Sequence, residues 1–146
     1  MVEKIINTTL ELGTELSALK DLEAGLEWFQ EKAQISQRDH FQIRLVLDEL
    51  VTNSVSYGFT GGVGSGITID IALLPDNYCE IVYIDDAPRF NPLEQTVRPR
   101  TSSSEAPNFG GFGIALVKNM MNELSYSYEN GRNIIKMKKK LDTDDE

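Results

Sequence analysis

Apolar residues recur at helical spacing in two stretches near the start of the chain, residues 16–34 and 37–57. In each stretch they return every three or four positions, which is the period of a helix with one buried face. Ser36 stands before the second stretch, where a serine side chain commonly caps the first turn of a helix. The pattern therefore predicts an amphipathic helix over 16–34 and a second helix from 37 to about Tyr57.

Other stretches follow the period of β-strands. Segments rich in β-branched residues, with partial alternation, lie at 4–12, 67–74 and 78–85. A hairpin is predicted over 125–139, because the Asn-Gly pair at 130–131 is a strong signal for a two-residue turn. Residues 110–124 are predicted to be a helix behind a glycine-rich start. These elements together predict an α/β fold of two layers, with helices covering one face of a mixed, mostly antiparallel sheet.

Chain length and loop composition add to this picture. The 146 residues support a single domain over 1–146, with an acidic tail over 142–146. Residues 87–109 contain four of the five prolines and a run of serines. Long loops of this kind inside a domain are commonly lids or disordered segments.

Charge and cysteine content exclude several classes of function. The formal net charge of −9 argues against nucleic-acid binding, since no basic surplus is available to neutralise phosphates. The basic run at 136–140 is interpreted as the solvated end of a strand, because acidic residues follow it at once. The single cysteine, Cys79, rules out an internal disulfide and a cysteine-based zinc cluster. No apolar stretch approaches the length of a membrane span and the start lacks a signal-peptide pattern, so we expect a cytoplasmic protein without membrane contact.

Polar residues lie in a regular row on the second predicted helix. Glu49 and Asn53 are four residues apart, so they lie one turn above the other, and Tyr57 continues the row. A solvated flank of the helix would explain this row without any chemistry. Two other features favour a site: Asp85 ends an apolar strand, and Gly-Gly-Phe-Gly at 110–113 begins a helix, where backbone N–H groups can bind an anion.

With these motifs in this order, about residues 4–141 resemble the GHKL ATPase superfamily, which includes gyrase and the histidine kinases, and within it the small anti-sigma-factor serine kinases of bacteria. The family's Glu-x-x-x-Asn motif matches Glu49 and Asn53, its Asp-x-Gly motif resembles Asp85 to Ala87, and its Gly-Gly-x-Gly motif matches residues 110–113. The resemblance implies the Bergerat-type ATP-binding fold, with 87–109 as the ATP lid.

The resemblance also implies a role for each matched residue. Glu49 would be the general base, and Asn53 would be a neutral ligand of Mg²⁺. Asp85 would accept the exocyclic amine of adenine, beside Ala87. Backbone N–H groups would approach the phosphates of ATP at Gly110, Gly111, Phe112 and Gly113.

The chain departs from the family pattern at Ala87, where the family has glycine. If this position requires a positive φ or very close approach to adenine, the methyl group adds strain or crowding. We therefore expect ATP to bind, but more weakly than it would beside a glycine. Tyr57 replaces a histidine that is often found in the family and leaves the Glu–Asn pair unchanged.

The implied function is that of a serine/threonine protein kinase that uses ATP and Mg²⁺. By resemblance it would act as an anti-sigma factor, binding a sigma factor and phosphorylating a STAS-domain antagonist. A homodimer is also implied, with Trp28 and Phe29 as candidates for its interface. The alternative, motivated by Ala87, is a regulatory module of the same fold that holds nucleotide and sequesters a protein partner without transferring phosphate.

Overall fold

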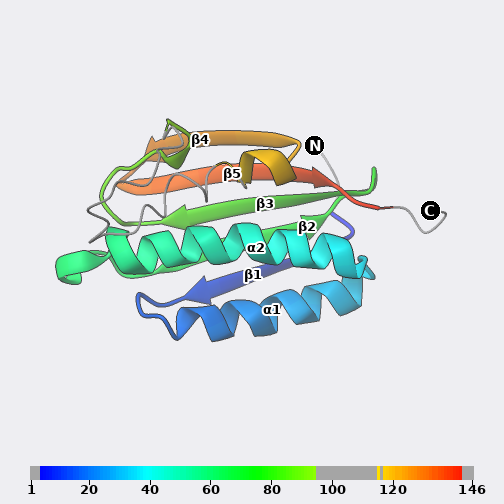
Figure 1. Cartoon of the computed structure of the whole chain (residues 1–146), viewed down its shortest axis with the longest axis horizontal. Coiled ribbons are helices and arrows are strands. Elements are labelled where there is room, and N and C mark those ends of the chain that lie inside the picture. Colours follow the sequence, from blue (N-terminus) through cyan, green and yellow to red (C-terminus); the bar gives the residue numbers. More distant parts are fainter. Residues whose placement is uncertain (1–3, 95–114, 116, 143–146) are drawn as a thin grey trace, which may run out of the picture.

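Among the described residues, five strands form one antiparallel sheet, and helices cover one face of it (Figure 1). The computed structural model describes residues 4–94, 115 and 117–142. The strands are β1 (Ile6–Leu12), β2 (Ile67–Leu73), β3 (Tyr78–Asp85), β4 (Glu123–Glu129) and β5 (Arg132–Lys140), in the spatial order β1-β2-β3-β5-β4. The two-layer α/β prediction is confirmed. The ladders among the described residues are all antiparallel, so the sheet there is not mixed.

The helices α1 (Ala18–Ala33) and α2 (Gln37–Asn53) form the second layer. Ser36 has an extended backbone, and its side-chain oxygen accepts a hydrogen bond from the N–H of Asp39 at 3.0 Å, which confirms the predicted cap. Fully buried side chains from both layers meet between helices and sheet, among them Leu22, Phe29, Leu47, Ile69 and Ile81. The core therefore lies on the helix-covered face of the sheet.

The hairpin β4–β5 forms as predicted, with its turn at Asn130 and Gly131. Both residues have positive φ values, 53° and 77°, which is the backbone of a type I′ turn. The turn pairs Glu129 with Arg132 and so sets the register of β4 against β5. The separate ladder between β3 and β5 places Asn133 opposite Asp85.

The prediction of a helix over 110–124 is wrong at its C-terminal end. Helical backbone stops at Met120, and β4 begins at Glu123. The N–H of Asn122 donates to the carbonyl of Lys138 at 2.8 Å, so hydrogen bonding to β5 draws the chain out of the helix and into the sheet. The predicted helix is too long because the helical spacing of apolar residues continues into the first residues of β4. The start of this helix lies outside the described residues.

The basic run at 136–140 is only partly the solvated strand end that was predicted. Lys136 and Lys140 are exposed, whereas Lys139 is buried on the helix-covered face. Its ammonium nitrogen lies 3.4 Å from a carboxylate oxygen of Asp39, which is buried as well. A buried charge requires such a partner, and sequence alone gave no indication of this pair.

Two further expectations concern the surface. Of the two candidates for a dimer interface, Phe29 is 1% exposed and belongs to the core, so only Trp28, which is 45% exposed, could contact another chain. None of the helices in the described ranges is long and apolar enough to cross a membrane.

Candidate functional site

Glu49 and Asn53 lie together near the end of α2. The side-chain nitrogen of Asn53 donates to a carboxylate oxygen of Glu49 at 3.0 Å. Burial raises the pKa of the Glu49 carboxyl above its ordinary value, and the hydrogen bond from Asn53 opposes part of that rise. The predicted pair is therefore joined by a hydrogen bond, and burial makes the Glu49 carboxylate easier to protonate.

Tyr57 does not continue the helical row. Residues Ser54–Gly58 form a π-helical turn, in which the N–H of Phe59 donates to the carbonyl of Ser54 at 2.8 Å. This five-residue spacing breaks the four-residue stacking on which the prediction for Tyr57 rested. Its side chain is 48% exposed.

Asp85 is held at the end of β3 by three hydrogen bonds. One carboxylate oxygen accepts from the hydroxyl of Ser54 at 2.6 Å. The other accepts from the side-chain nitrogen of Asn133 at 2.9 Å and from the N–H of Ala87 at 3.2 Å. Ser54 directly follows Asn53, so neighbouring residues at the end of α2 make the contacts to Glu49 and to Asp85.

Behind Ser54 lies a buried phenol that the sequence analysis did not identify. The hydroxyl of Tyr83 is 2.6 Å from that of Ser54 and donates to the carbonyl of Leu50 at 2.9 Å. Burial raises the pKa of Tyr83 well above its ordinary value, so the phenol remains neutral. Tyr83 therefore ties the end of α2 to β3, two residues before Asp85.

The strain expected at Ala87 is absent. Positive φ values among the described non-glycine residues occur at Gln34, Asn77 and Asn130, and Ala87 is not one of them. Its methyl group is buried beside Gly58, where an added Cβ would lie only 2.8 Å from the Ala87 Cβ. The missing side chain at Gly58 is what makes room for this methyl group.

Asp86, the next residue after Asp85, anchors the loop between α2 and β2. Its carboxylate accepts hydrogen bonds from the N–H groups of Ser65 and Gly66 and from the Ser65 hydroxyl. These bonds, led by the one from the Ser65 hydroxyl, lower the pKa of the Asp86 carboxyl. Asp86 therefore holds a loop in place, while Asp85 points to the other side of the strand.

Gly110, Gly111, Phe112 and Gly113 lie outside the described residues, as does the predicted lid beyond Glu94. The described start of that segment runs from Ala87 to a short 3-10 turn at Pro92–Glu94.

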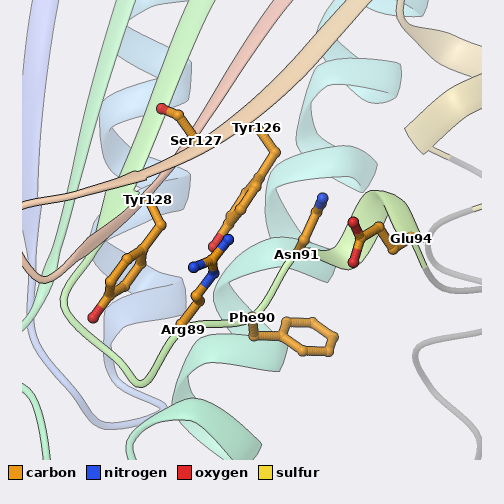
Figure 2. Close-up of a pocket in the computed structure, with 7 residues that line it drawn as sticks. All are labelled: Arg89, Phe90, Asn91, Glu94, Tyr126, Ser127 and Tyr128. Atoms are coloured by element: carbon orange, nitrogen blue, oxygen red, sulfur yellow. The ribbon is translucent and has the colours of Figure 1, made fainter.

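This start of the segment borders a cavity of about 510 Å³ at the edge of the sheet (Figure 2). The lining residues are Arg89, Phe90, Asn91, Glu94, Tyr126, Ser127 and Tyr128. The guanidinium carbon of Arg89 lies 5.5 Å from the centre of the Tyr128 ring, a cation–π distance. Neither Glu49 nor Asp85 lines this cavity, so it is separate from their contacts.

The side-chain oxygen atoms near Glu49 suit one kind of cation. No group of three or more acidic, histidine or cysteine side chains able to hold a metal exists among residues 4–94, 115 and 117–142. The hydrogen bond to Glu49 uses the nitrogen of the Asn53 carboxamide, and its oxygen is the atom that could bind a cation. Mg²⁺ is commonly bound in this way, by one or two protein oxygens together with substrate phosphates.

Comparisons with known proteins find related sequences and folds. The family model of the histidine kinase-like ATPase domain matches residues 14–139. A serine/threonine-protein kinase of Bordetella bronchiseptica, BtrW, is 27% identical over 125 residues, which is 86% of this chain and 87% of BtrW.

Solved structures show the same fold. A Mycobacterium tuberculosis structure of RsbU and RsbW domains matches with a TM-score of 0.68 and 18% identity. The match covers 93% of this chain but only 32% of that longer one. A chain of the SiaB–SiaC complex of Pseudomonas aeruginosa matches with a TM-score of 0.63 and 14% identity, over 93% of this chain and 89% of that one.

Proposed function

The chain belongs to the family of histidine kinase-like ATPase domains, and on this basis we propose that it is an ATP-dependent serine/threonine protein kinase. One observation carries the proposal: consecutive residues Asn53 and Ser54 contact Glu49 and Asp85, respectively. These two contacts support a site in which Glu49 would be the proton acceptor, Asn53 the neutral oxygen ligand and Asp85 the carboxylate that reads the base. The similarity to BtrW, a serine/threonine-protein kinase, supports the same activity.

Asp85 would select adenine. A carboxylate accepts a hydrogen bond from the exocyclic amine of adenine, whereas guanine presents a carbonyl at the equivalent ring position. Each carboxylate oxygen has two acceptor sites. The bonds from Asn133 and Ala87 fill those of one oxygen, and the single bond from Ser54 leaves one site on the other oxygen for a ligand. A charge-assisted bond of this kind contributes about 1.5–3 kcal/mol.

Glu49 would be the general base for phosphate transfer. Its carboxylate takes the proton of a substrate hydroxyl while the hydroxyl oxygen bonds to the γ-phosphorus, and the bond from that phosphorus to the bridging oxygen breaks to release ADP. The raised pKa of Glu49 favours this role, since it brings the base nearer to the pH at which it works. Asn53 would hold Mg²⁺, which supplies charge neutralisation to the phosphates.

The proposed protein substrate is a STAS-domain antagonist, and the proposed second partner is a sigma factor that the kinase binds and inhibits. The resemblance to anti-sigma-factor kinases supports this partner switching, as does the match to a chain solved in the SiaB–SiaC complex. A homodimer remains part of the proposal, with Trp28 as its exposed candidate residue.

The experiment that tests this proposal is transfer of labelled γ-phosphate from ATP to the STAS-domain protein encoded nearest to this chain. We expect label on a serine or threonine of that protein, and none when GTP replaces ATP. If the chain binds ATP but transfers no phosphate to any cognate STAS protein, it is a nucleotide-dependent binding module and not a kinase.

A further inference from the structure

Asn133 is a buried polar residue that faces Asp85 across the β3–β5 ladder. Its side chain is 4% exposed, and it lies on the helix-covered face, where the next β5 positions on that face are Ile135 and Met137. The two N–H hydrogens of its side-chain nitrogen are shared among three acceptors, Asp85 at 2.9 Å and the carbonyls of Ala87 and Pro88, each at 3.1 Å.

The oxygen of the same carboxamide is used as well. It accepts from the N–H of Phe90 at 2.9 Å and from the hydroxyl of Tyr126 on β4. One side chain thus connects the carboxylate of Asp85, the backbone of residues 87–90 and a tyrosine of the neighbouring strand. Tyr126 and Phe90 also line the cavity of Figure 2.

A carboxamide at this place is costly unless it makes these bonds, because a buried amide without partners is strongly destabilising. An apolar side chain, like those of its neighbours on β5, would fill this core position without needing such bonds. What the carboxamide adds is the shorter of two bonds that orient Asp85 on one side: Ser54 holds one carboxylate oxygen, and Asn133 together with the N–H of Ala87 holds the other. With both oxygens held, the carboxylate cannot rotate about its last bond.

We infer that Asn133 is a positioning residue that fixes the plane of the Asp85 carboxylate and the chain direction of residues 87–90. The inference rests on the proposed function, since it takes Asp85 as the acceptor for adenine. Base selectivity then depends on a residue that is 48 positions away in sequence and is held in turn by Tyr126.

The test compares three variants with the wild-type chain by calorimetric titration of ATP and GTP. Asn133→Asp keeps the shape and the oxygen that accepts from Phe90 and Tyr126, but it replaces the donor to Asp85 with an acceptor. Asn133→Leu removes all five bonds. Asn77→Asp is the matched control, because the Asn77 carboxamide donates to the carbonyls of Leu141 and Asp142, just beyond the opposite end of β5.

We expect Asn133→Asp to weaken ATP binding by about 10-fold or more at mildly alkaline pH, and to reduce the preference for ATP over GTP. At mildly acidic pH the variant should recover, since two facing carboxyls share a proton and the proton restores a donor between them. The other titratable groups around this position are the phenols of Tyr126 and Tyr83 and the guanidinium of Arg89 near Tyr128. Burial raises the pKa of both phenols above their ordinary value, which keeps them neutral in this range. Asn133→Leu should bind ATP weakly at both pH values, and Asn77→Asp should bind ATP with the affinity of the wild type.

Several results would overturn the inference. One is an Asn133→Asp variant that binds ATP with wild-type affinity and preference, while the wild type itself discriminates against GTP. Another is an equal loss in Asn133→Asp and Asn133→Leu with no recovery at lower pH, which would mark a purely structural role. Wild-type chain that binds neither ATP nor ADP would instead remove the proposed function, and this inference with it.

If the Asn133 variants do not fold, Tyr126→Phe provides the test, because it deletes only the hydroxyl that donates to Asn133. We expect ATP to bind about 2- to 10-fold more weakly, with GTP affinity changed less. Unchanged ATP affinity in a folded Tyr126→Phe chain would overturn the link from Tyr126 through Asn133 to Asp85.

Discussion

Because Gly58 and Ala87 are in contact, Gly58→Ala should change the free energy of unfolding in opposite directions when residue 87 is alanine and when it is glycine. A Cβ at Gly58 would lie 2.8 Å from the Ala87 Cβ, whereas carbon atoms pack best at about 3.5–4.0 Å. Overpacking of this kind costs about 1–3 kcal/mol. Against it stands a gain of about 0.4–1 kcal/mol, because alanine restricts the unfolded chain more than glycine does. Gly58→Ala should therefore lower the free energy of unfolding by about 1 kcal/mol.

In the Ala87→Gly background the clash is removed. The next described atom, the carbonyl oxygen of Asn53, lies 3.9 Å from the added Cβ, so only the gain remains. Gly58→Ala should then raise the free energy of unfolding by up to about 1 kcal/mol.

The assay is urea unfolding of the four chains of this double-mutant cycle. Gly13→Ala is the control, because no described atom lies within 4 Å of a Cβ at that position. It should be neutral or slightly stabilising in both backgrounds. An effect of Gly58→Ala that is the same in both backgrounds would refute the reasoning, since the two residues would then not be in contact.

Three other perturbations have defined outcomes. Asp85→Ala should weaken ATP and ADP binding by about 10- to 100-fold in calorimetry, and equal wild-type affinity for ATP and GTP would remove its assignment to adenine. Lys139→Met should lower the free energy of unfolding by about 3 kcal/mol, because the buried Asp39 carboxylate loses the ammonium at 3.4 Å and keeps the hydrogen bond from the N–H of Asp142. Arg38→Met removes a guanidinium that is 72% exposed and should change the free energy of unfolding by less than about 0.5 kcal/mol. Because burial raises the folded-state pKa of Glu49, its ionisation destabilises the fold as pH rises from the ordinary glutamate value through the folded value. Glu49→Gln should therefore raise the midpoint of thermal unfolding at neutral pH and leave it unchanged below about pH 4.

Local patterns in the sequence were enough to predict most elements and the first contact of the site. The four-residue spacing of Glu49 and Asn53 placed them on one line of a helix, and their hydrogen bond follows from that spacing. The Asn-Gly turn at 130–131 fixed the hairpin register in the same local way.

The rest of the site depends on contacts that local patterns do not encode. Ser54 and Asp85 are 31 residues apart, and the pairing of Asp85 with Asn133 follows from the ladder between β3 and β5. The π-helical turn at Ser54–Gly58 has no sequence signal of its own and displaced Tyr57 from the predicted row. Nothing in the local sequence marks Gly58, although the structure gives it the role of accommodating Ala87.

The measurement that tests the central claim most directly is single-turnover phosphate transfer by Glu49→Gln, with ATP affinity measured on the same preparation. The amide of glutamine can still contact Asn53, so the nucleotide contacts are retained while the proton acceptor is lost. We expect ATP affinity to stay within about threefold of wild type while transfer to the STAS protein slows by about 10²- to 10⁴-fold. Transfer at the wild-type rate would show that Glu49 is not the general base and would contradict the proposed catalytic site.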